Sequence, residues 1–589
     1  MNPKPQITVL DTGGQYCHLI SRKVRELGVY ADVRRSETPA AELAGRKGLI
    51  ISGGPSSVYD PGSPTVDPEI FANGHAVLGI CYGLHLMAHA LGGNVVKGGK
   101  GEFGLATLEV HGADPLLAGL PARQQIWMSH RDVVAAPPAG FQVTASTDTC
   151  AVAAMSEPAR RLFALQFHPE VIHTTHGKEV LARFLFEVCR CERDWDPEHR
   201  APEIEEEIRR TVGERNVFFF VSGGVDSTVA YTLCLNALGP DRVRGVYVDT
   251  GLMREGETEF VERTFNSLGK GTLSVERAAQ YFLPALETMT DPEQKRRLIG
   301  EEFLRIQERV IEERHLLDGH WVLGQGTIYP DTIESGGTEK AALIKTHHNR
   351  VEGVQRLIAE RRIIEPLCSY YKDEVREIGR GMGLPESLLE RHPFPGPGLA
   401  IRCLCADARA ALEPVEGGYI VPVHSVGVQG DSRSYAPVLA LDRFPDEAAR
   451  LHDAATELIN RLSGVNRVVA VVASRAALRE MAVRPGRLSA ERLARLRRAD
   501  AIVRRLSSES GFDRKVWQFP VVLIPVGTET ARDSVVLRPI ESVDGMTARS
   551  VLMDEVALRA MAAEVLRIEG VAAVFYDLTH KPPATIEWE

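Results

Sequence analysis

The sequence predicts an α/β protein in which two parallel-sheet domains precede a C-terminal α+β region. Three observations support this fold class. Short apolar runs alternate with helical patterns over residues 1–195, the alternation restarts within residues 196–402, and residues 403–589 follow another pattern. A length of 589 residues also exceeds what one hydrophobic core supports, so two to four domains are expected.

The first domain begins with apolar runs that we interpret as buried strands, at residues 7–10, 49–52 and 76–80. An amphipathic helix pattern follows the first run, over residues 18–27. This order of elements is typical of a parallel sheet with crossover helices. The charged stretch 192–215, which contains two prolines and an acidic helix pattern, is interpreted as a linker.

The second domain starts with the apolar run 217–221, and further strand patterns follow at 243–248 and 321–323. Residues 335–349 are rich in Gly, Thr, Lys and His, which is typical of a mobile loop. The run HPFPGPG at 392–398 marks the end of this domain.

The C-terminal region contains an apolar run at 467–472 and a basic helix pattern at 488–505. Two other segments, 420–428 and 522–527, are both extended and both centred on Pro-Val. Their similarity is explained equally well by chance and by duplication of a subdomain.

Composition argues against several classes of protein. The net charge of −10 disfavours a nucleic-acid partner. The nine cysteines lack regular spacing, which indicates reduced thiols, and the pairs 189/191 and 403/405 are too close-set for zinc knuckles. No run of 18 apolar residues and no signal-peptide pattern occur, so we expect a cytoplasmic protein without a membrane partner.

A cysteine follows the third strand of the first domain. Cys81 is preceded by VLGI and followed by Tyr82 and Gly83, with a helix expected from Leu84. On a strand-to-helix turn of this kind a thiol is exposed, and the helix N-terminus favours its thiolate. A lone free cysteine is more often buried and inert, so this motif needs support from elsewhere in the chain.

A histidine motif supplies that support. The run QFHPE at 166–170 follows the apolar run 162–165. His168 is suited to take the thiol proton, and Glu170 is suited to orient the imidazole. A histidine after one strand and a cysteine on a turn after another rarely occur together by chance.

A glycine-rich turn follows the second strand of the first domain, with the sequence ISGGP at 51–55. The backbone N–H of Gly54, together with that of Tyr82, is a candidate oxyanion hole. Taken alone, this motif is explained better as an ordinary turn between a strand and a helix.

Together these three motifs resemble the class I, or triad, glutamine amidotransferases over about the first 195 residues. The resemblance implies that Cys81 attacks the side-chain amide of glutamine, forms a thioester and releases ammonia. The chain departs from this family at His85, where the family has a glutamine that contacts the substrate. An imidazole still donates or accepts a hydrogen bond at that position.

A second centre is predicted where the second domain begins. The run VSGGVDS at 221–227 follows an apolar strand and precedes a helix expected from Thr228. Two glycines let the backbone approach an anion, and the helix N-terminus supplies oriented N–H groups. Asp226 is suited to bind Mg²⁺ that accompanies a pyrophosphate. No lysine follows the glycines, so the run is not a Walker A loop.

This loop resembles that of the N-type ATP pyrophosphatases, whose fold is adenine-nucleotide α-hydrolase-like. The resemblance implies that ATP is cleaved between its α and β phosphates and that AMP is transferred to a substrate oxygen. It implies no organic prosthetic group. The residues it assigns to ATP are Ser222, Gly223, Gly224, Val225, Asp226, Ser227 and Val248.

Four further segments carry a resemblance that covers nearly the whole chain. They are GQGTIYPD at 324–331, IKTHHN at 344–349, HPFPGPG at 392–398 and KPPATIEWE at 581–589. With the two centres they resemble the glutamine-hydrolysing GMP synthases. The resemblance implies that xanthosine 5′-phosphate (XMP), ATP, glutamine and water yield GMP, AMP, pyrophosphate and glutamate. ATP adenylates the purine 2-oxygen, and ammonia then displaces AMP.

The same resemblance implies a nucleotide site in the C-terminal region. Lys581 is expected to meet the XMP phosphate, with Gln518, Ile586 and Glu587 nearby and Arg467 as a weaker candidate. The loop 335–349 is expected to close over the phosphates as a lid, against the alternative of a solvated surface loop. Its candidate residues are Lys340, Lys345, His347 and His348.

Residues 423–435 resemble the longer, eukaryotic-like form of this family, which carries two copies of a dimerisation subdomain. The resemblance implies related subdomains at 403–500 and 501–589. A second copy is able to cover the surface used for self-association, so a monomer and a homodimer are both open.

Two other functions are weighed against this one. The first is an amidating synthetase of the same architecture that acts on another carbonyl substrate, which the KPP segment disfavours. The second is a nucleotide-binding or regulatory protein whose glutaminase has decayed, which only His85 favours.

Overall fold

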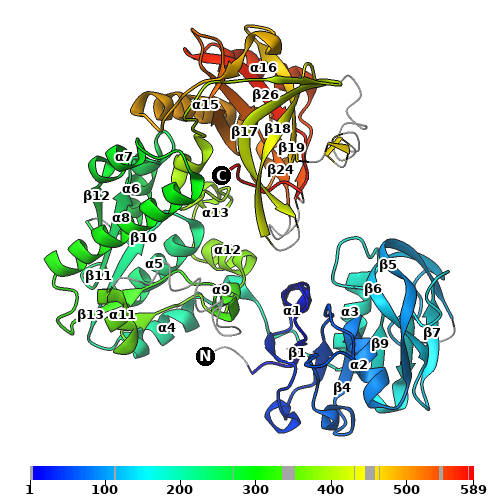
Figure 1. The fold of residues 1–589 in the computed structure, drawn as a ribbon. Coiled ribbons are helices and arrows are strands. Elements are labelled where there is room, and N and C mark those ends of the chain that lie inside the picture. The colour runs from blue at the N-terminus through cyan, green and yellow to red at the C-terminus, as the bar shows by residue number, and fades with distance from the viewer. Residues whose placement is uncertain are drawn as a thin grey trace. The chain divides into compact units, whose positions relative to one another are not determined.

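In the computed structural model the chain folds as two units, Met1–Arg200 and Ala201–Glu589 (Figure 1). The structure describes residues 4–111, 114–269, 271–334, 352–429, 432–444, 455, 458–459, 461–462, 464–542, 548–581 and 583–589. Within these ranges, no helix is both long enough and apolar enough to cross a membrane.

A nine-stranded sheet forms the centre of the first unit, in the order β2-β1-β3-β4-β9-β8-β7-β5-β6. Strands β2 to β9 in that order are parallel, as the apolar runs predict, and β8 to β6 continue the sheet in antiparallel pairs. The strands are β1 (Ile7–Asp11), β2 (Ala31–Arg35), β3 (Gly48–Ile51), β4 (Ala76–Ile80), β5 (Asn94–Val110), β6 (Arg123–Ala136), β7 (Gln142–Ser146), β8 (Ala154–Glu157) and β9 (Leu162–Leu165).

Helices cover both faces of this sheet. Helices α1 (Cys17–Glu26) and α3 (Gly177–Arg183) belong to one apolar core, and α2 (Tyr82–Ala90) belongs to the core of the other face. Helix α2 begins at Tyr82 rather than at the expected Leu84, so its first turn follows Cys81 directly.

The stretch interpreted as a linker divides between the two units. Residues 192–200 belong to the first unit, and helix α4 (Ala201–Val212) belongs to the second. Ile204, Ile208 and Val212 lie on the buried face of α4, so this acidic helix is part of a packed core.

The second unit begins with a five-stranded parallel sheet in the order β12-β11-β10-β13-β14. Its strands are β10 (Asn216–Val221), β11 (Val243–Asp249), β12 (Leu273–Arg277), β13 (Trp321–Gly324) and β14 (Ile363–Ile364). The accompanying helices are α5 (Val225–Leu238), α6 (Glu257–Leu268), α7 (Ala279–Leu286), α8 (Pro292–Glu313), α9 (Tyr329–Glu334), α11 (Glu352–Ala359), α12 (Lys372–Gly381) and α13 (Glu386–Leu389). Helix α5 begins three residues before the expected Thr228.

The C-terminal region contains a seven-stranded sheet in the order β16-β17-β18-β19-β26-β23-β21. Its strands are β16 (Glu413–Val415), β17 (Gly418–Gln429), β18 (Ser432–Leu441), β19 (Arg467–Ser474), β21 (Val521–Ile524), β23 (Asp533–Leu537) and β26 (Val571–Asp577). Two smaller sheets join β15 (Ala410–Ala411), β20 (Ala482–Val483) and β22 (Val526–Gly527), and β24 (Ile540–Glu541) with β25 (Arg549–Ser550). Its long helices are α15 (Ala490–Glu509) and α16 (Glu555–Leu566).

The seven-stranded sheet repeats one strand order in its two halves. β17 pairs antiparallel with β18, which is parallel to β19, while β21 pairs antiparallel with β23, which is parallel to β26. β19 and β26 meet antiparallel at the middle of the sheet. The two expected subdomains therefore share one continuous sheet, and their common origin stays a prediction.

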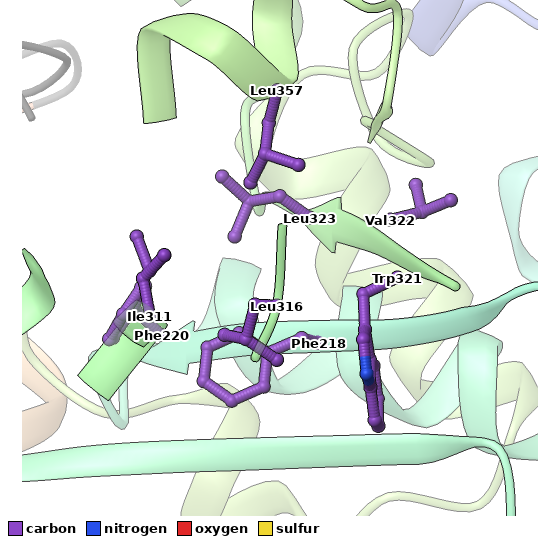
Figure 2. A pocket seen from close by; sticks show the side chains of 8 residues that line it. All are labelled: Phe218, Phe220, Ile311, Leu316, Trp321, Val322, Leu323 and Leu357. Atoms are coloured by element: carbon purple, nitrogen blue, oxygen red, sulfur yellow. The ribbon is translucent and has the colours of Figure 1, made fainter. Parts of the chain in front are cut away.

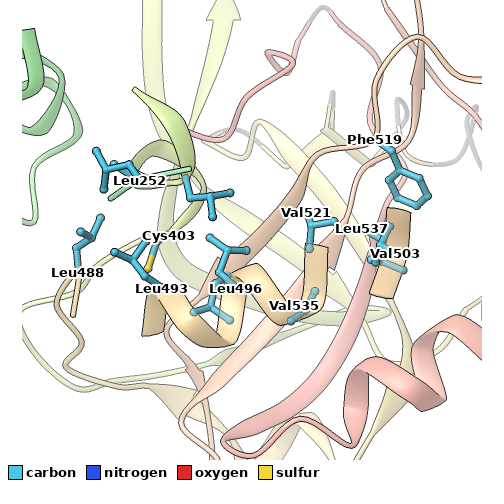
Figure 3. Packing of buried hydrophobic residues seen from close by; sticks show 14 of the residues in the cluster. Leu252, Cys403, Leu488, Leu493, Leu496, Val503, Phe519, Val521, Val535 and Leu537 are labelled. Carbon is cyan, nitrogen blue, oxygen red and sulfur yellow. The ribbon is translucent and has the colours of Figure 1, made fainter. Parts of the chain in front are cut away.

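Helix α15 joins the two parts of the second unit through one apolar cluster (Figure 3). Its residues Leu493, Leu496 and Val503 belong to the same cluster as Leu252, which follows β11, and as residues of β21 and β23. Leu493 and Val503 are fully buried, as is Leu496. Since the cluster also contains Phe218 of β10, the core is continuous from the parallel sheet to the C-terminal sheet.

We expect Leu496→Ala to lower the free energy of unfolding of the second unit by about 2–5 kcal/mol, because it leaves a cavity in this shared cluster. Ile358→Ala on α11 is the matched control, because Ile358 is 41% exposed and its loss should change stability by less than about 0.5 kcal/mol. Urea unfolding of both variants measures the difference. Equal effects of the two substitutions would contradict the shared core.

Candidate functional site

The carboxyl ends of four adjacent parallel strands meet at one edge of the first sheet. In the order β1-β3-β4-β9, these ends are followed by Thr12, by Ser52 to Gly54, by Cys81 and by Gln166 to His168. Ligands of open α/β sheets bind at this edge, so the fold itself gathers the predicted residues of the first centre.

Cys81 lies on a strained turn between β4 and α2. Its φ of 53° is in the left-handed region, which a non-glycine residue rarely adopts. Its backbone N–H donates to Leu165 O at 2.7 Å, and its thiol donates to Ser129 O at 3.4 Å. The turn thus holds the sulfur atom at the N-terminus of α2.

His168 lies between Cys81 and Glu170. Its Nδ1 atom is 2.6 Å from Glu170 Oε1, and both side chains are buried. Burial disfavours the charged imidazole, but the Glu170 carboxylate and the hydrogen bonds with Cys81 and Glu170 outweigh it and raise the pKa of His168 to about 10. An imidazolium beside the sulfur stabilises the thiolate form of a cysteine.

Gly53 allows the turn after β3 to approach this pair. A Cβ atom at Gly53 would lie 2.9 Å from Cε1 of His168 and 3.4 Å from Cβ of Cys81. Thr12 holds the turn, since its hydroxyl donates to Gly53 O at 2.7 Å. Thr12 was not among the residues predicted from the sequence. It directly follows the first predicted strand, however, just as the predicted residues follow their own strands.

The two residues assigned to an oxyanion hole are neighbours in space. A Cβ atom at Gly54 would lie 3.4 Å from Cδ1 of Tyr82. Tyr16, which the sequence pattern did not indicate, contacts His168 edge-on with ring centroids 5.1 Å apart. The structure therefore brings the residues of the first centre together, and the oxyanion role of Gly54 and Tyr82 stays a prediction.

His85 is buried beneath this centre rather than exposed. Its Nε2 atom is 2.8 Å from Gln166 Oε1, and burial lowers its pKa to about 4, so the imidazole is neutral at pH 7. The amide nitrogen of Gln166 is buried without a hydrogen-bond partner among the described residues. His85 thus contacts Gln166, which lies two residues before His168.

The second centre is a turn between β10 and α5. Gly223 adopts a φ of 75°, and Ser222 Oγ accepts from the Gly224 N–H at 3.2 Å and lies 3.0 Å from Ser227 Oγ. Ser222 and Gly224 are exposed, while the first turn of α5 begins at Val225. Exposed N–H groups and hydroxyls at a helix N-terminus form a cradle for a phosphate chain.

Gly326, after β13, packs directly on this cradle. A Cβ atom at Gly326 would lie 2.8 Å from the backbone nitrogen of Ser227 and 2.9 Å from its Cα. The segment 324–331 that carried part of the resemblance therefore borders the cradle. A side chain at this position would cover the N-terminus of α5.

Asp226 has the properties of a cation ligand beside the cradle. Burial raises its pKa, its Oδ2 atom is 3.4 Å from Lys372 Nζ, and its Oδ1 atom has no hydrogen-bond partner among the described residues. The Asp331 carboxylate is close enough to raise the same pKa. Mg²⁺ is held in proteins by one or two carboxylates together with substrate phosphates, so this donor set fits it. Within the described ranges, no group of three or more metal-binding side chains occurs.

Two cations beside the cradle were not indicated by the sequence. Lys372 begins α12 and pairs with Asp226, and Arg391 donates to Gly223 O at 3.4 Å and pairs with Glu257 at 2.6 Å. Both are distant in sequence from the cradle, so no local spacing could reveal them. Their charge suits a site for phosphates.

Two groups of predicted residues have other outcomes. Val248 lies in β11 with its side chain in the apolar core, so its backbone is the part available to a ligand. The lid residues Lys340, Lys345, His347 and His348 lie outside the described residues.

The predicted nucleotide residues of the C-terminal region lie around the segment that ends the parallel-sheet part. Gln518 donates to Pro393 O at 3.2 Å, and its Oε1 atom is buried without a partner among the described residues. Glu587 accepts two hydrogen bonds from Arg402, at 2.9 and 2.7 Å. The Arg402 guanidinium is 5.4 Å from the ring centroid of Phe394, so the two predicted residues flank one segment.

Arg467 is fully buried, and its guanidinium nitrogens other than Nε donate hydrogen bonds to protein groups. It pairs with Asp577 at 2.9 Å and donates to Glu587 O at 2.9 Å, while Arg538 pairs with Asp577 at 2.7 Å and donates to Ile586 O at 2.9 Å. Burial opposes the charge of Asp577, but the two arginines hold the pKa of this carboxyl below its usual range. Arg467 and Arg538 therefore clamp the backbone of the C-terminal tail, residues 583–589.

The tail is anchored at both of its ends. Before it, Lys581 exchanges backbone hydrogen bonds with Ala548, at 2.7 and 3.1 Å. At its end, the buried Glu589 carboxylate pairs with Lys295 of α8 at 2.7 Å. These contacts fix Ile586 and Glu587 between two parts of the second unit, whereas contact of Lys581 with a phosphate stays a prediction.

A small pocket in the parallel-sheet part has a different character (Figure 2). The side chains that line it come from β10, β13 and neighbouring helices and loops, and they include Phe218, Trp321 and Leu357. This lining is apolar, so it offers no group for binding a charged nucleotide.

Family models match three parts of the chain. "Glutamine amidotransferase class-I" matches residues 8–188, "NAD synthase" matches 200–295 and "GMP synthase C terminal domain" matches 506–588. The chain is 41% identical over 603 residues to "Probable GMP synthase (glutamine-hydrolyzing)" of Leptospira interrogans, with 99% of each chain covered. It is 41% identical over 594 residues to "GMP synthase (glutamine-hydrolyzing)" of Carboxydothermus hydrogenoformans, with 99% of each covered. Its identity to the enzyme of that name from Symbiobacterium thermophilum is 44% over 505 residues, with 80% of this chain and 97% of the other covered.

We expect Gly53→Ala to slow alkylation of Cys81 by iodoacetamide at pH 7 by roughly tenfold, because the added methyl displaces the His168 ring from the sulfur. Gly300→Ala on α8 is the control, since a Cβ atom there meets nothing within 4 Å and the residue does not have a positive φ. Peptide mass spectrometry over time gives both rates. An unchanged rate in Gly53→Ala would contradict the described approach.

The pair formed by His168 and Glu170 predicts a stability that depends on pH. Because the pKa of His168 is raised from 6.5 to about 10, its stabilising effect is full below pH 6.5 and is lost as the pH rises to about 10. Glu170→Gln should therefore lower the free energy of unfolding by on the order of 3 kcal/mol more at pH 6.5 than at pH 10. The melting temperature should accordingly fall strongly at pH 6.5 and much less at pH 10. Thermal unfolding of both proteins across this range measures it, and a gap independent of pH would contradict the pairing.

Proposed function

The chain belongs to the family of glutamine-hydrolysing GMP synthases, and from this premise we propose which of its residues carry each step of GMP formation. The enzyme is a ligase of purine nucleotide biosynthesis that joins nitrogen from glutamine to a purine carbon. Its substrates are XMP, ATP and glutamine, and its products are GMP, AMP, pyrophosphate and glutamate. The observation that carries the assignment is the strained Cys81 turn facing the His168–Glu170 pair, in a chain that also holds the phosphate cradle.

Ammonia is produced at the first centre. The Cys81 thiolate attacks the side-chain carbonyl carbon of glutamine, and the N–H groups of Gly54 and Tyr82 hold the resulting oxyanion. His168 gives its proton to the leaving nitrogen, which departs as ammonia and leaves a thioester. Water, deprotonated by His168, then hydrolyses the thioester to glutamate and frees the thiolate.

The second centre activates the purine. The turn from Ser222 to Ser227 holds the phosphates of ATP, and the backbone of Val248 lies by the adenine. The purine 2-oxygen attacks the α-phosphorus, and pyrophosphate leaves. A purine oxygen is a poor leaving group, and its adenylate is a good one, so ammonia displaces AMP at carbon 2.

Mg²⁺ is proposed to accompany ATP at Asp226, with Asp331 as a second carboxylate. When bound, this ion neutralises charge on the phosphate oxygens. Lys372 and Arg391 support the same site from neighbouring segments. The lid residues Lys340, Lys345, His347 and His348 are proposed to cover the phosphates and exclude water.

XMP is proposed to bind against the C-terminal tail. Lys581 meets its phosphate, and Gln518, Ile586 and Glu587 shape the pocket. Arg467 is saturated by protein groups, so we assign it a positioning role that acts through the backbone of the tail.

We propose three functional parts, a glutaminase at 1–195, an ATP pyrophosphatase at 196–402 and a substrate-binding and dimerisation region at 403–589. The enzyme is proposed to work in the cytoplasm as a monomer or homodimer. No nucleic acid, membrane or organic prosthetic group has a part in the proposed reaction.

Separate substitutions test whether the first centre produces ammonia and the second uses ATP. Cys81→Ala should lower glutamine-dependent GMP formation by about 10³-fold or more and leave ammonia-dependent formation within about twofold, because only the first centre needs the thiol. Asp226→Asn should lower both by about 10²-fold. Cys150→Ala removes another buried thiol of the first unit and is the matched control. Equal losses of both activities in Cys81→Ala would contradict the scheme.

The acceptor is tested in the same assay. With Mg-ATP and ammonium, the wild-type chain should form product from XMP and none from deamido-NAD or aspartate. The match of residues 200–295 to NAD synthase makes this comparison necessary, because an ATP site of this kind is shared between acceptors. Amination of deamido-NAD or aspartate at the rate of XMP would overturn the substrate assignment.

A further inference from the structure

Two cysteines follow the helical segment that begins with α3, near the end of the first unit. Helix α3 continues into a π-helical turn, Phe184–Val188, which is followed by Cys189, Arg190 and Cys191. The N–H groups of Cys189 and Cys191 donate to the consecutive carbonyls of Phe184 and Leu185, each at 2.9 Å. Both cysteines pack with the same apolar core.

The backbone folds back between these two cysteines. Cys189 has a right-handed helical conformation, with φ of −80° and ψ of −20°, and Arg190 has a left-handed one, with φ of 54°. The left-handed turn at Arg190 brings the Cα atoms on either side of it, those of Cys189 and Cys191, near each other, as a disulfide requires. Gly48 of β3 leaves the space for the Cys189 sulfur, because a Cβ atom there would collide with it.

The two thiols differ in exposure and acidity. Cys189 is 5% exposed, and burial raises its pKa, whereas Cys191 is half-buried. The hydrogen bond from the Cys189 thiol, together with the charge of Lys47, lowers the pKa of Cys191. Lys47 is held there by its hydrogen bond to Arg190 O at 3.3 Å. Cys191 is therefore an accessible nucleophile, with a second thiol two residues away on the same turn.

We propose that Cys189 and Cys191 are a reversible oxidation site, at which a hydroperoxide converts the two thiols into a disulfide. The Cys191 thiolate attacks a peroxide oxygen, so that its sulfur becomes a sulfenic acid and hydroxide leaves. The Cys189 sulfur then displaces the hydroxyl group from Cys191, and water leaves after the Cys189 proton is transferred. In total two thiols and one hydrogen peroxide give one disulfide and two waters, with the peroxide reduced by two electrons.

The disulfide closes a small ring at the start of the strap, residues 189–195. The strap runs over the first unit, since Gln6 and Glu192 exchange hydrogen bonds at 2.8 and 2.9 Å and the N–H groups of Asp194 and Trp195 donate to Gly28 O. Trp195 also stacks on Tyr30, with ring centroids 4.4 Å apart. A ring closed over one intervening residue is strained, and strained disulfides are easily reduced, which makes the site reversible.

A second pair with the same spacing is the matched control within the chain. The Cys405 thiol donates to the backbone oxygen of Cys403 at 3.6 Å rather than to its thiol, and the Cys403 side chain is fully buried. The Cys403 thiol is thus not the hydrogen-bond partner of Cys405, and its full burial shields it from the exchange. The geometry predicts a disulfide at 189/191 and none at 403/405.

The test treats the full-length protein with increasing hydrogen peroxide, blocks free thiols with iodoacetamide and digests it with trypsin without reduction. Trypsin cleaves after Arg190, so the peptide ending there and the peptide beginning at Cys191 should stay joined by the disulfide and separate after dithiothreitol. The joined form should be about tenfold more abundant than any disulfide at 403/405. In Cys189→Ser, Cys191 should instead advance to the sulfinic acid.

Two results would overturn the proposal. One is equal oxidation of both pairs to disulfides. The other is the same sulfinic product at Cys191 in wild type and in Cys189→Ser, which would mean that the Cys189 sulfur does not intercept the sulfenic acid. Because the measurement is made on the wild-type chain, a folding defect in the variant does not affect the main result.

Discussion

Both chemical centres depend on backbone segments approaching each other more closely than a side chain would permit. At the first centre, Gly53 leaves the space that the His168 ring occupies beside Cys81, and at the second, Gly326 leaves the space over the nitrogen of Ser227. In both units the approach occurs where parallel strands end, because those ends are gathered at one edge of the sheet. The two proposed reactions differ, but in both the N–H groups of such turns are expected to hold charge on oxygen.

In the C-terminal region, side-chain contacts hold an irregular tail that is not paired as a strand along its whole length. Arg467 and Arg538 share the carboxylate of Asp577, and each also donates hydrogen bonds to carbonyls of the tail. A buried arginine is tolerated because its donors are nearly all satisfied. The same tail ends in an ion pair between Glu589 and Lys295, so its position is tied to α8 of the parallel-sheet part.

Much of the architecture follows from local sequence patterns, because buried parallel strands are short, continuous apolar runs. The strands at 7–10, 76–80 and 217–221 lie where those runs predict them, and the Cys81, His168 and Glu170 motifs follow such runs directly. The antiparallel half of the first sheet was not predicted, because β5 and β6 alternate in polarity and lack an apolar run. Lys372 and Arg391 were also missed, since their nearness to the cradle arises from tertiary packing and leaves no trace in sequence spacing.

The seam of this sheet, where β19 and β26 meet antiparallel, has a consequence for how the sheet can evolve. If its halves were separate, identical chains, each substitution would appear on both sides of the seam at once. Here one gene encodes both sides, so Arg467 on one strand faces a carboxylate, Asp577, that belongs to the other strand alone. Covalent joining thus lets the two sides accept different mutations, and one side is free to keep a ligand pocket while the other becomes only scaffold.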